Sequence, residues 1–249
     1  MLKLMMMSAV LMSLSLSSFS KVNYVTKTLN DQYREELRDM AMQNHRPLTN
    51  YRNSRKLIMQ KVHLKSDSKG YFVKDVYCNI KFRGSISPSD MPSANKINIE
   101  HTWPRSRFSS SKGSTKYKQE LADLHHLYPT ESRSNSVRGN HEFTQFKTGG
   151  AAVGKNCISS KVGRSPQTGA RSFEPPFEHK GDVARALFYM AVRYNERISS
   201  HEEFVLRQWH IMDPVDQKEI DRNDRVEQLQ GNRNPFVDDQ DLVNLIQNF

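Results

Sequence analysis

The chain has 249 residues, and its 37 Lys and Arg residues outnumber the 27 Asp and Glu residues, for a formal net charge of +10. A chain of this length can bury one sizeable core, and no repeat or long structureless linker divides it, so we expect one domain after a short leader. The positive charge favours a polyanionic partner such as nucleic acid or an anionic membrane face, although many basic proteins carry such charge for solubility alone.

The first twenty residues have the order of a secretory signal peptide. A cation near the start is followed by an apolar run and then by small residues at Ser18 and Ser20. We therefore predict a signal peptide over residues 1–20 and a mature domain over residues 21–249, exported to the periplasm or secreted. An uncleaved membrane anchor is the alternative, but the apolar run is short for a bilayer span, and no later segment is apolar enough to cross one.

Two amphipathic helices are expected next, and a strand or hairpin after them. Asn30 or Asp31 can cap the first helix, and Thr49 can cap the second. The run over residues 71–82 is rich in β-branched and aromatic residues, which predicts a strand or hairpin, followed by a Ser/Pro loop through Ser93.

Residues 96–140 hold most of the polar side chains that could perform chemistry. A short strand-like stretch delivers Glu100 and His101, and a second segment over residues 122–140 gathers an acid, two histidines and Asn135. Neighbouring side chains on a strand point to opposite faces, so Glu100 and His101 need not touch, but they can flank a common substrate if the strand ends at a cleft. A helix beginning at Asn135 would bring an amide oxygen back toward this strand.

Beyond this segment, the sequence predicts a long basic loop and then three helices. The loop over residues 144–173 has five cations, five glycines and no acid, so it could follow a phosphate chain or form a mobile surface excursion. Asp182 can begin a core helix, and the pair Asp213 and Pro214 can begin another that runs to about Gln230. The last helix would place an apolar stripe at the C-terminus. The predicted fold class is α+β, mostly helical with a few short strands.

The residue types in this central segment suit phosphodiester hydrolysis. That reaction needs a base to deprotonate water and a divalent cation to offset charge in the transition state. A neutral imidazole suits the first role, and one carboxylate with one amide oxygen suits a hard ion such as Mg²⁺. Zinc usually takes more nitrogen or sulfur ligands, and the motif H-E-x-x-H is absent. Zinc-finger and helix-turn-helix signatures are absent too, which favours a grip on the nucleic-acid backbone over one on the bases.

Several motifs follow one another along the chain, namely E-H-T-W-P at 100–104, D-L-H-H-L-x-P at 123–129, N-S-V-R-G-N at 135–140, K-G-D-V-A-R-A-L-F-Y-M at 180–190 and R-N-D-R-V-E-Q-L-Q-G-N-R-N-P-F-V-D at 222–238. In these motifs the chain resembles the bacterial endonuclease I family of periplasmic and secreted nucleases, from about residue 30 to the C-terminus. The resemblance implies a single domain with a small ββα-metal (His-Me finger) motif. It also implies sequence-nonspecific cleavage of DNA, and of RNA too, to 5′-phosphorylated oligonucleotides.

Position by position, the resemblance implies a role for each residue of the motifs. His101 is expected to be the general base, and Glu100 and Asn135 the protein ligands of one Mg²⁺, for which Mn²⁺ or Ca²⁺ could substitute. These roles agree with those inferred from the residues alone. His125 falls on a histidine of the family, where we expect a structural or orienting role. His126 stands where many relatives have asparagine, which leaves its role open.

The family also uses a cation near the scissile phosphate, but the spacing between the motifs does not place it. A solvated loop is the alternative to phosphate contact for the cations that follow His101. The candidates for contact with nucleic acid are Arg105, Arg107, Lys112, Lys116, Lys118 and Arg138.

Cys78 and Cys157 are the two cysteines of the chain, which excludes a four-cysteine zinc site. In an oxidising compartment they can form one disulfide, and two unrelated buried thiols are the alternative. We expect a monomer that acts on DNA, and on RNA as well, without stable membrane association once the leader is removed. A noncatalytic basic nucleic-acid-binding protein and a metallohydrolase of another substrate are the competing hypotheses. The biological role and the preference between DNA and RNA stay open.

Overall fold

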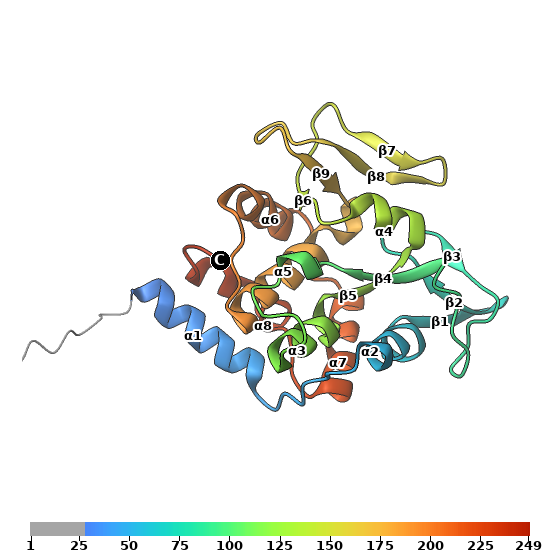
Figure 1. Ribbon diagram of the computed structural model, residues 1–249, viewed down its shortest axis with the longest axis horizontal. Coiled ribbons are helices and arrows are strands. Elements are labelled where there is room, and N and C mark those ends of the chain that lie inside the picture. The colour runs from blue at the N-terminus through green and yellow to red at the C-terminus, as the bar shows by residue number, and fades with distance from the viewer. Residues whose placement is uncertain (1–27) are drawn as a thin grey trace, which may run out of the picture.

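The computed structural model describes residues 28–249, so the signal peptide predicted over residues 1–20 lies outside the described residues. The described part of the chain combines helices with three small sheets, which confirms the α+β class (Figure 1). No helix in this part is long and apolar enough to cross a membrane.

The helices differ in length and are distributed along the described part of the chain. In chain order, the α-helices are α1 (Leu29–Met42), α2 (Tyr51–Leu57), α3 (Thr115–Ala122), α4 (Ser132–Arg138), α5 (Lys180–Tyr194), α6 (Ser200–Met212), α7 (Gln217–Gln230) and α8 (Pro235–Asp238). Shorter helical segments of other types are the π-helical turn η1 (Ile58–Val62) and the 3-10 segments η2 (Arg105–Arg107), η3 (Leu124–His126), η4 (Phe177–His179) and η5 (Gln240–Leu245).

Each of the three sheets is small. The first has the order β1 (Leu64–Asp67), β2 (Gly70–Lys74), β3 (Lys81–Phe82), all antiparallel. The second pairs β4 (Ile97–His101) with β5 (Leu127–Glu131), also antiparallel. The third has the order β6 (Glu142–Phe143), β9 (Arg171–Glu174), β8 (Cys157–Arg164), β7 (Ala151–Gly154), in which only the β6 and β9 pair is parallel.

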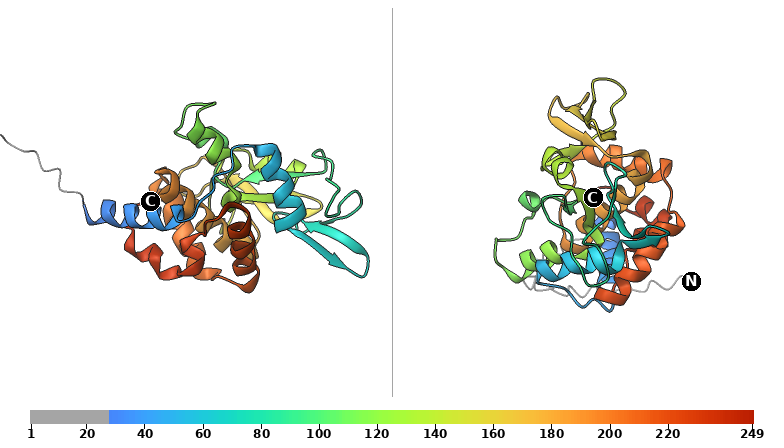
Figure 2. Two further views of the ribbon diagram at one scale, coloured as in Figure 1. Left: turned by 90° about the horizontal axis from the view of Figure 1, so that it is seen from below. Right: turned by 90° about the vertical axis from the view of Figure 1, so that its right-hand side faces the viewer.

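The hairpin predicted over residues 71–82 is confirmed as β2 and β3, and Figure 2 shows β1 and β2 projecting from the helical body. The long loop predicted over residues 144–173 is wrong, because this stretch forms β7, β8 and most of β9. Its pattern misleads because Ser160 faces inward and donates to the carbonyl of Tyr77 (2.7 Å), whereas Ile158 is 74% exposed. A strand that buries serine and exposes isoleucine lacks the apolar alternation that identifies strands.

Several helix boundaries differ from the predictions because other side chains cap them. The side chain of Thr28 caps α1 and that of Asn50 caps α2, each one or a few residues from the expected position. Helix α7 begins after Asp216, whose side chain accepts from the amide of Glu219, and not at Asp213. Its predicted end at Gln230 is confirmed.

Helix α5 is the central element of the core and packs against α1 and α6. Its Phe188 stacks on Phe249 with ring centroids 4.3 Å apart, so the C-terminus packs onto the body as expected. The helix predicted there is the 3-10 segment η5. The predicted core helix after Asp182 is also confirmed, although it begins at Lys180.

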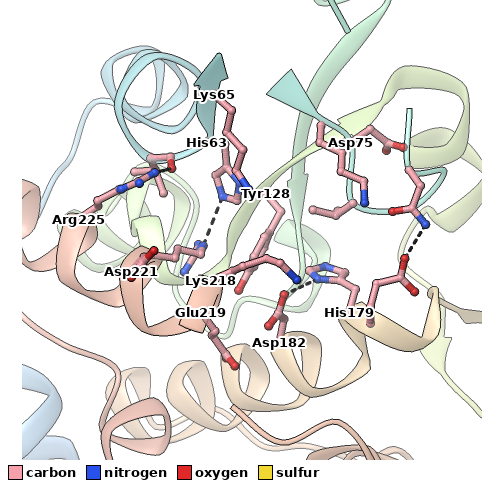
Figure 3. Close-up of a pocket in the computed structure, with 16 residues that line it drawn as sticks. His63, Lys65, Asp75, Tyr128, His179, Asp182, Lys218, Glu219, Asp221 and Arg225 are labelled. Carbon is pink, nitrogen blue, oxygen red and sulfur yellow. Dashed lines mark hydrogen bonds and ion pairs between the residues drawn. The ribbon is translucent and has the colours of Figure 1, made fainter. Parts of the chain in front are cut away.

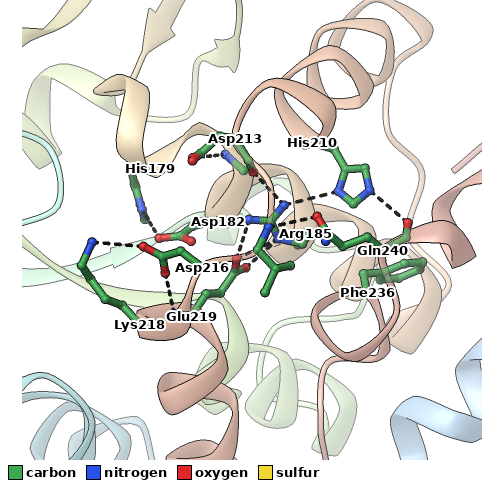
Figure 4. A network of polar contacts seen from close by, with 12 residues as sticks. His179, Asp182, Arg185, His210, Asp213, Asp216, Lys218, Glu219, Phe236 and Gln240 are labelled. Carbon is green, nitrogen blue, oxygen red and sulfur yellow. Dashed lines mark hydrogen bonds and ion pairs between the residues drawn. The ribbon is translucent and has the colours of Figure 1, made fainter.

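A buried polar network fixes α5 against α6 and α7 (Figure 4). Arg185 of α5 donates to both carboxylate oxygens of Glu219 and to the carbonyl of Asp213 (3.0 Å). Its guanidinium also lies 3.5 Å from Nδ1 of His210, whose Nε2 is 3.0 Å from the carbonyl of Gln240. The buried charge of Arg185 is thus paired with Glu219 and hydrogen-bonded. The network therefore links α5, α6 and α7 without leaving an unpaired ion in the core.

Cys78 and Cys157 form a disulfide, so the structure decides between the two alternatives that the sequence left open. It joins the segment between β2 and β3 to the start of β8, across a sequence separation of 79 residues. Ser134 of α4 lies beside it, with its hydroxyl 2.8 Å from the sulfur of Cys78.

The two-stranded sheet of β4 and β5 is held from outside by two charged side chains. Asp75 accepts from the hydroxyl of Thr130 (3.0 Å) and from the amide of Glu131 (2.8 Å). From the other end, Arg222 of α7 donates to the carbonyl of Leu127 (3.1 Å). A two-stranded ribbon is marginal alone in water, so these contacts contribute to keeping it in place.

Candidate active site

A cleft of about 750 Å³ opens beside β4, α4 and the loop that follows β4. β4 pairs along its whole length with β5, and α4 follows β5 directly and packs on both strands (Figure 1). Glu100 and His101 end β4, and Asn135 lies in α4. All three line the cleft, so the fold brings together the residues predicted as metal ligands and base.

Glu100 is buried, and two polar groups contact one of its carboxylate oxygens. The hydroxyl of Tyr77 donates to Oε1 (2.9 Å), and Nε of Arg138 lies 3.0 Å from the same atom. Burial raises the pKa of Glu100, while the charge of Arg138 and the hydrogen bond from Tyr77 act against that rise. Because both contacts use Oε1, Oε2 is left for a ligand.

His101 is held as a neutral imidazole. Its Nε2 lies 3.1 Å from the carbonyl of Leu121, and a carbonyl can only accept, so Nε2 carries the hydrogen and Nδ1 is the basic nitrogen. The ring packs between Tyr51 and His126, with centroid distances of 5.0 and 5.4 Å. Burial, followed by the charges of His126 and Arg105, holds the pKa of His101 well below its ordinary value. Near neutral pH, the ring therefore has a free lone pair.

Asn135 is oriented by β4 through its amide nitrogen. Nδ2 donates to Oδ1 of Asn98 (2.6 Å) and to the carbonyl of Ile99 (3.0 Å). With both amide hydrogens used, the oxygen is the remaining polar atom of the side chain. The helix that carries Asn135 begins earlier than predicted, at Ser132, because the side chain of Glu131 caps it.

Oε2 of Glu100 and Oδ1 of Asn135 are two oxygen atoms of cleft-lining residues that could contribute to holding a metal ion. Among the described residues, no group of three His, Cys, Asp or Glu side chains is arranged to do so. One carboxylate and one amide oxygen fit a hard cation that keeps several of its waters, as Mg²⁺ does.

The structure separates the predicted nucleic-acid contacts into two groups. Arg105 and Lys112 line the cleft. Arg107 instead pairs with buried Glu202 (2.6 Å) and lies over the ring of Trp103.

Lys116 lies 3.4 Å from both Glu120 and Glu196 and does not line the cleft, and neither does Lys118. The two carboxylates compensate the charge of Lys116 where it stands. Of the five loop cations predicted as candidates for contact with nucleic acid, the fold therefore leaves two facing the cleft, Arg105 and Lys112.

Arg138 is fully buried, contrary to the prediction that it contacts nucleic acid. Its guanidinium donates to the carbonyls of Thr102 (2.7 Å) and Gly139 (3.0 Å), in addition to its contact with Glu100. The last turn of α4 directs this side chain inward, where the carboxylate of Glu100 compensates its charge. Arg138 positions Glu100 and does not face the cleft.

The family model of Endonuclease I matches residues 19–241. The chain belongs to the Endonuclease I family. An extracellular ribonuclease of Bacillus subtilis is 37% identical over 161 residues, which cover 57% of this chain and 50% of the relative. An extracellular deoxyribonuclease of Aeromonas hydrophila is 28% identical over 187 residues, or 66% of this chain and 79% of the relative. Endonuclease-1 of Buchnera aphidicola is 29% identical over 156 residues, or 58% and 60%. The match with the ribonuclease thus spans about half of that protein's length.

In this Endonuclease I chain, the adjacent residues His125 and His126 are buried and do not line the cleft. Nε2 of His125 is 3.1 Å from the carbonyl of Asn232, and Nε2 of His126 is 2.8 Å from that of Glu120. Burial lowers the pKa of His125 to about 3 and that of His126 to about 4. The structural role expected for His125 agrees with this placement, and His126 packs against the ring of His101.

Three neighbours of the site were not predicted from the sequence. Tyr77 and Tyr51 reach it from distant elements, and nothing in their local sequence marks them. Asn98 could have been found, because it lies two residues before Glu100 and so shares a face of the strand with it.

Proposed function

We propose that this Endonuclease I chain is an exported, metal-dependent endonuclease that hydrolyses phosphodiester bonds in DNA and in RNA with little sequence preference. The observation that carries the proposal is one cleft lined by His101, Glu100 and Asn135 and by two cations. Family membership supports it, as do relatives that are named extracellular or periplasmic nucleases, some for DNA and some for RNA.

The cleft residues would divide the chemistry between them. His101 would take a proton from water at Nδ1, while the carbonyl of Leu121 holds the ring in the required tautomer. Glu100 and Asn135 would hold Mg²⁺ through Oε2 and Oδ1, with Mn²⁺ or Ca²⁺ as substitutes. When bound, the ion would offset negative charge on the reacting phosphate. β4, β5 and α4 would then be the ββα-metal motif of the family.

Arg105 and Lys112 would contact phosphates of the substrate. We assign Arg105 to the scissile phosphate, because it lines the cleft and lies close enough to His101 for its charge to lower the pKa of that imidazole. Contact through phosphates does not read bases, which would give the low sequence preference. Products with 5′-phosphates are what the family resemblance implies.

Cleavage of supercoiled plasmid by the mature protein in Mg²⁺ tests the proposal. His101→Ala should bind DNA but cut at least ~100-fold more slowly, and EDTA should stop cleavage by the wild type. His201→Ala is a matched control, because this histidine lies on α6 and does not line the cleft. Binding without cleavage by the wild type would favour the noncatalytic binding protein, and absence of binding would favour another substrate.

A further inference from the structure

A second hollow, of about 240 Å³, is lined by Tyr128 of β5 together with residues outside the β4 and β5 ribbon, and it shares no lining residue with the cleft (Figure 3). We call it the His179 cavity. Its walls come from β1, β2, β5, η4, α5 and α7. Val62, Val76 and Tyr128 give it an apolar part, and charged side chains surround the rest.

His179 contributes an unpartnered polar atom to this cavity. The residue is 3% exposed, and its Nδ1 lies 2.8 Å from the carboxylate of Asp182. Its Nε2 is buried and has no hydrogen-bond partner among the described residues. Buried polar atoms without partners are rare in folded proteins, and each calls for an explanation such as a missing ligand. An anion at Nε2 would provide one, because a protonated imidazole can donate to Asp182 and to the anion together.

Five cations also line the His179 cavity: Lys65, Lys74, Lys218, Arg222 and Arg225. Burial lowers the pKa of Lys65, and the next largest causes are the charges of Lys218, Arg225 and Lys74. These three cations are therefore close enough to Lys65 to repel its charge. Neither Lys65 nor Lys74 has an ion-pair or hydrogen-bond partner for its ammonium group within residues 28–249, so an anion entering the cavity would relieve this repulsion.

The five acidic side chains that line the cavity have other partners than Lys65 and Lys74. Asp75 accepts from Thr130 and from backbone amides, and Asp182 contacts His179. Glu178 accepts from Asn79 (2.7 Å), Glu219 pairs with Arg185, and Asp221 accepts from Gln217 (2.8 Å). Lys218 pairs with Asp216 outside the cavity lining (3.0 Å). Lys65 and Lys74 are therefore left without an ion pair among the described residues.

We propose that the His179 cavity binds the terminal phosphate of a phosphate monoester, with Nε2 of His179, Lys65 and Lys74 as its contacts and the apolar wall beside the organic part of the ligand. His179 is buried, so a ligand must enter the cavity to reach its Nε2. A terminal phosphate has one substituent and can enter with its free oxygens first. A phosphodiester carries a substituent on each side, which would keep its phosphate out of the cavity. The inference does not depend on the proposed nuclease activity.

The experiment titrates the mature protein with inorganic phosphate, and separately with adenosine 5′-monophosphate, in EDTA. Binding is followed by the NMR signals of the His179 ring, which report this cavity even if phosphate also enters the cleft. Those signals are assigned by their loss in His179→Gln. Both ligands should shift them saturably, and the monoester should bind more tightly because it also contacts the apolar wall.

Lys65→Gln and Lys74→Gln should each raise the apparent Kd at the His179 ring by about 5- to 10-fold, the effect of losing one charged hydrogen bond. Lys69→Gln removes the same charge from the turn of the same hairpin without lining the cavity, so it should leave Kd unchanged. A ring signal that phosphate does not move would overturn the proposal. So would equal effects of Lys65→Gln and Lys69→Gln, or a DNA oligonucleotide without terminal phosphate that shifts the ring as strongly as the monoester.

Discussion

Lys112→Gln and Lys116→Gln form a pair that tests how the structure sorts the cations of the loop after β4. Both lysines follow His101 in the same basic stretch, but Lys112 lines the cleft, whereas Lys116 lies 3.4 Å from two carboxylates. A lysine that neutralises one phosphate contributes about 0.9 to the slope of log affinity against log salt. Losing it should therefore reduce the fall in affinity between about 50 and 200 mM salt by a factor of about 3.5.

The assay is fluorescence anisotropy of a labelled DNA duplex in EDTA, which prevents cleavage during the titration. Lys112→Gln should flatten the salt dependence by that factor, and Lys116→Gln should leave it parallel to that of the wild type. Thermal unfolding of both variants controls for loss of fold. The reasoning fails if Lys112→Gln runs parallel to the wild type, or if both variants flatten the dependence equally.

Three further predictions concern stability. Arg107→Gln leaves buried Glu202 without its counter-ion. The free energy of unfolding in urea should therefore fall by about 3 kcal/mol. An unchanged midpoint of urea unfolding would contradict a stabilising ion pair between Arg107 and Glu202. Burial keeps His125 neutral in the folded protein and lowers its pKa from 6.5 to about 3. As pH falls, the imidazole is therefore protonated in the unfolded chain before it is protonated in the fold. The stability that His125 contributes is complete above the unfolded pKa and is lost as pH falls toward about 3. Urea unfolding should show a loss of about 3 kcal/mol between about pH 7 and 4, and a smaller one in His125→Phe. Replacing Cys78 and Cys157 by alanine removes a cross-link between residues separated by 79 positions, and the free energy of unfolding should fall by about 4.5 kcal/mol. A reductant should lower the stability of the wild type but have no effect on this variant.

Patterns in the sequence predicted those parts of the fold that depend on neighbouring residues, such as an amphipathic helix or a helix end. The apolar spacing after Asp182 located α5, and α7 ends at the predicted Gln230, just before Gly231, which adopts a positive φ that favours glycine. The sheet of β7, β8 and β9 was missed because its inward residues include Ser160, which is satisfied by a carbonyl far away in sequence. Burial of a polar residue is decided by such a partner, and a local pattern does not contain it.

The candidate site shows the same division. Adjacent residues and family motifs indicated Glu100, His101 and Asn135, and the fold brings them to one cleft. The cations could not be sorted from the sequence, because their partners are remote: Arg107 and its carboxylate partner are 95 residues apart. The inward direction of Arg138 depends on where α4 begins, and the sequence placed that beginning at Asn135, three residues after Ser132.

The ribbon of β4 and β5 carries two of the three proposed catalytic and ligand residues, yet within residues 28–249 no third strand pairs with it. Its strand β5 is anchored by Asp75 at one end and by Arg222 at the other. Precision at the cleft is therefore set partly by residues that never meet the substrate. In a map of mutational tolerance, Asp75 and Arg222 should rank with Glu100 and His101, although neither lines the cleft.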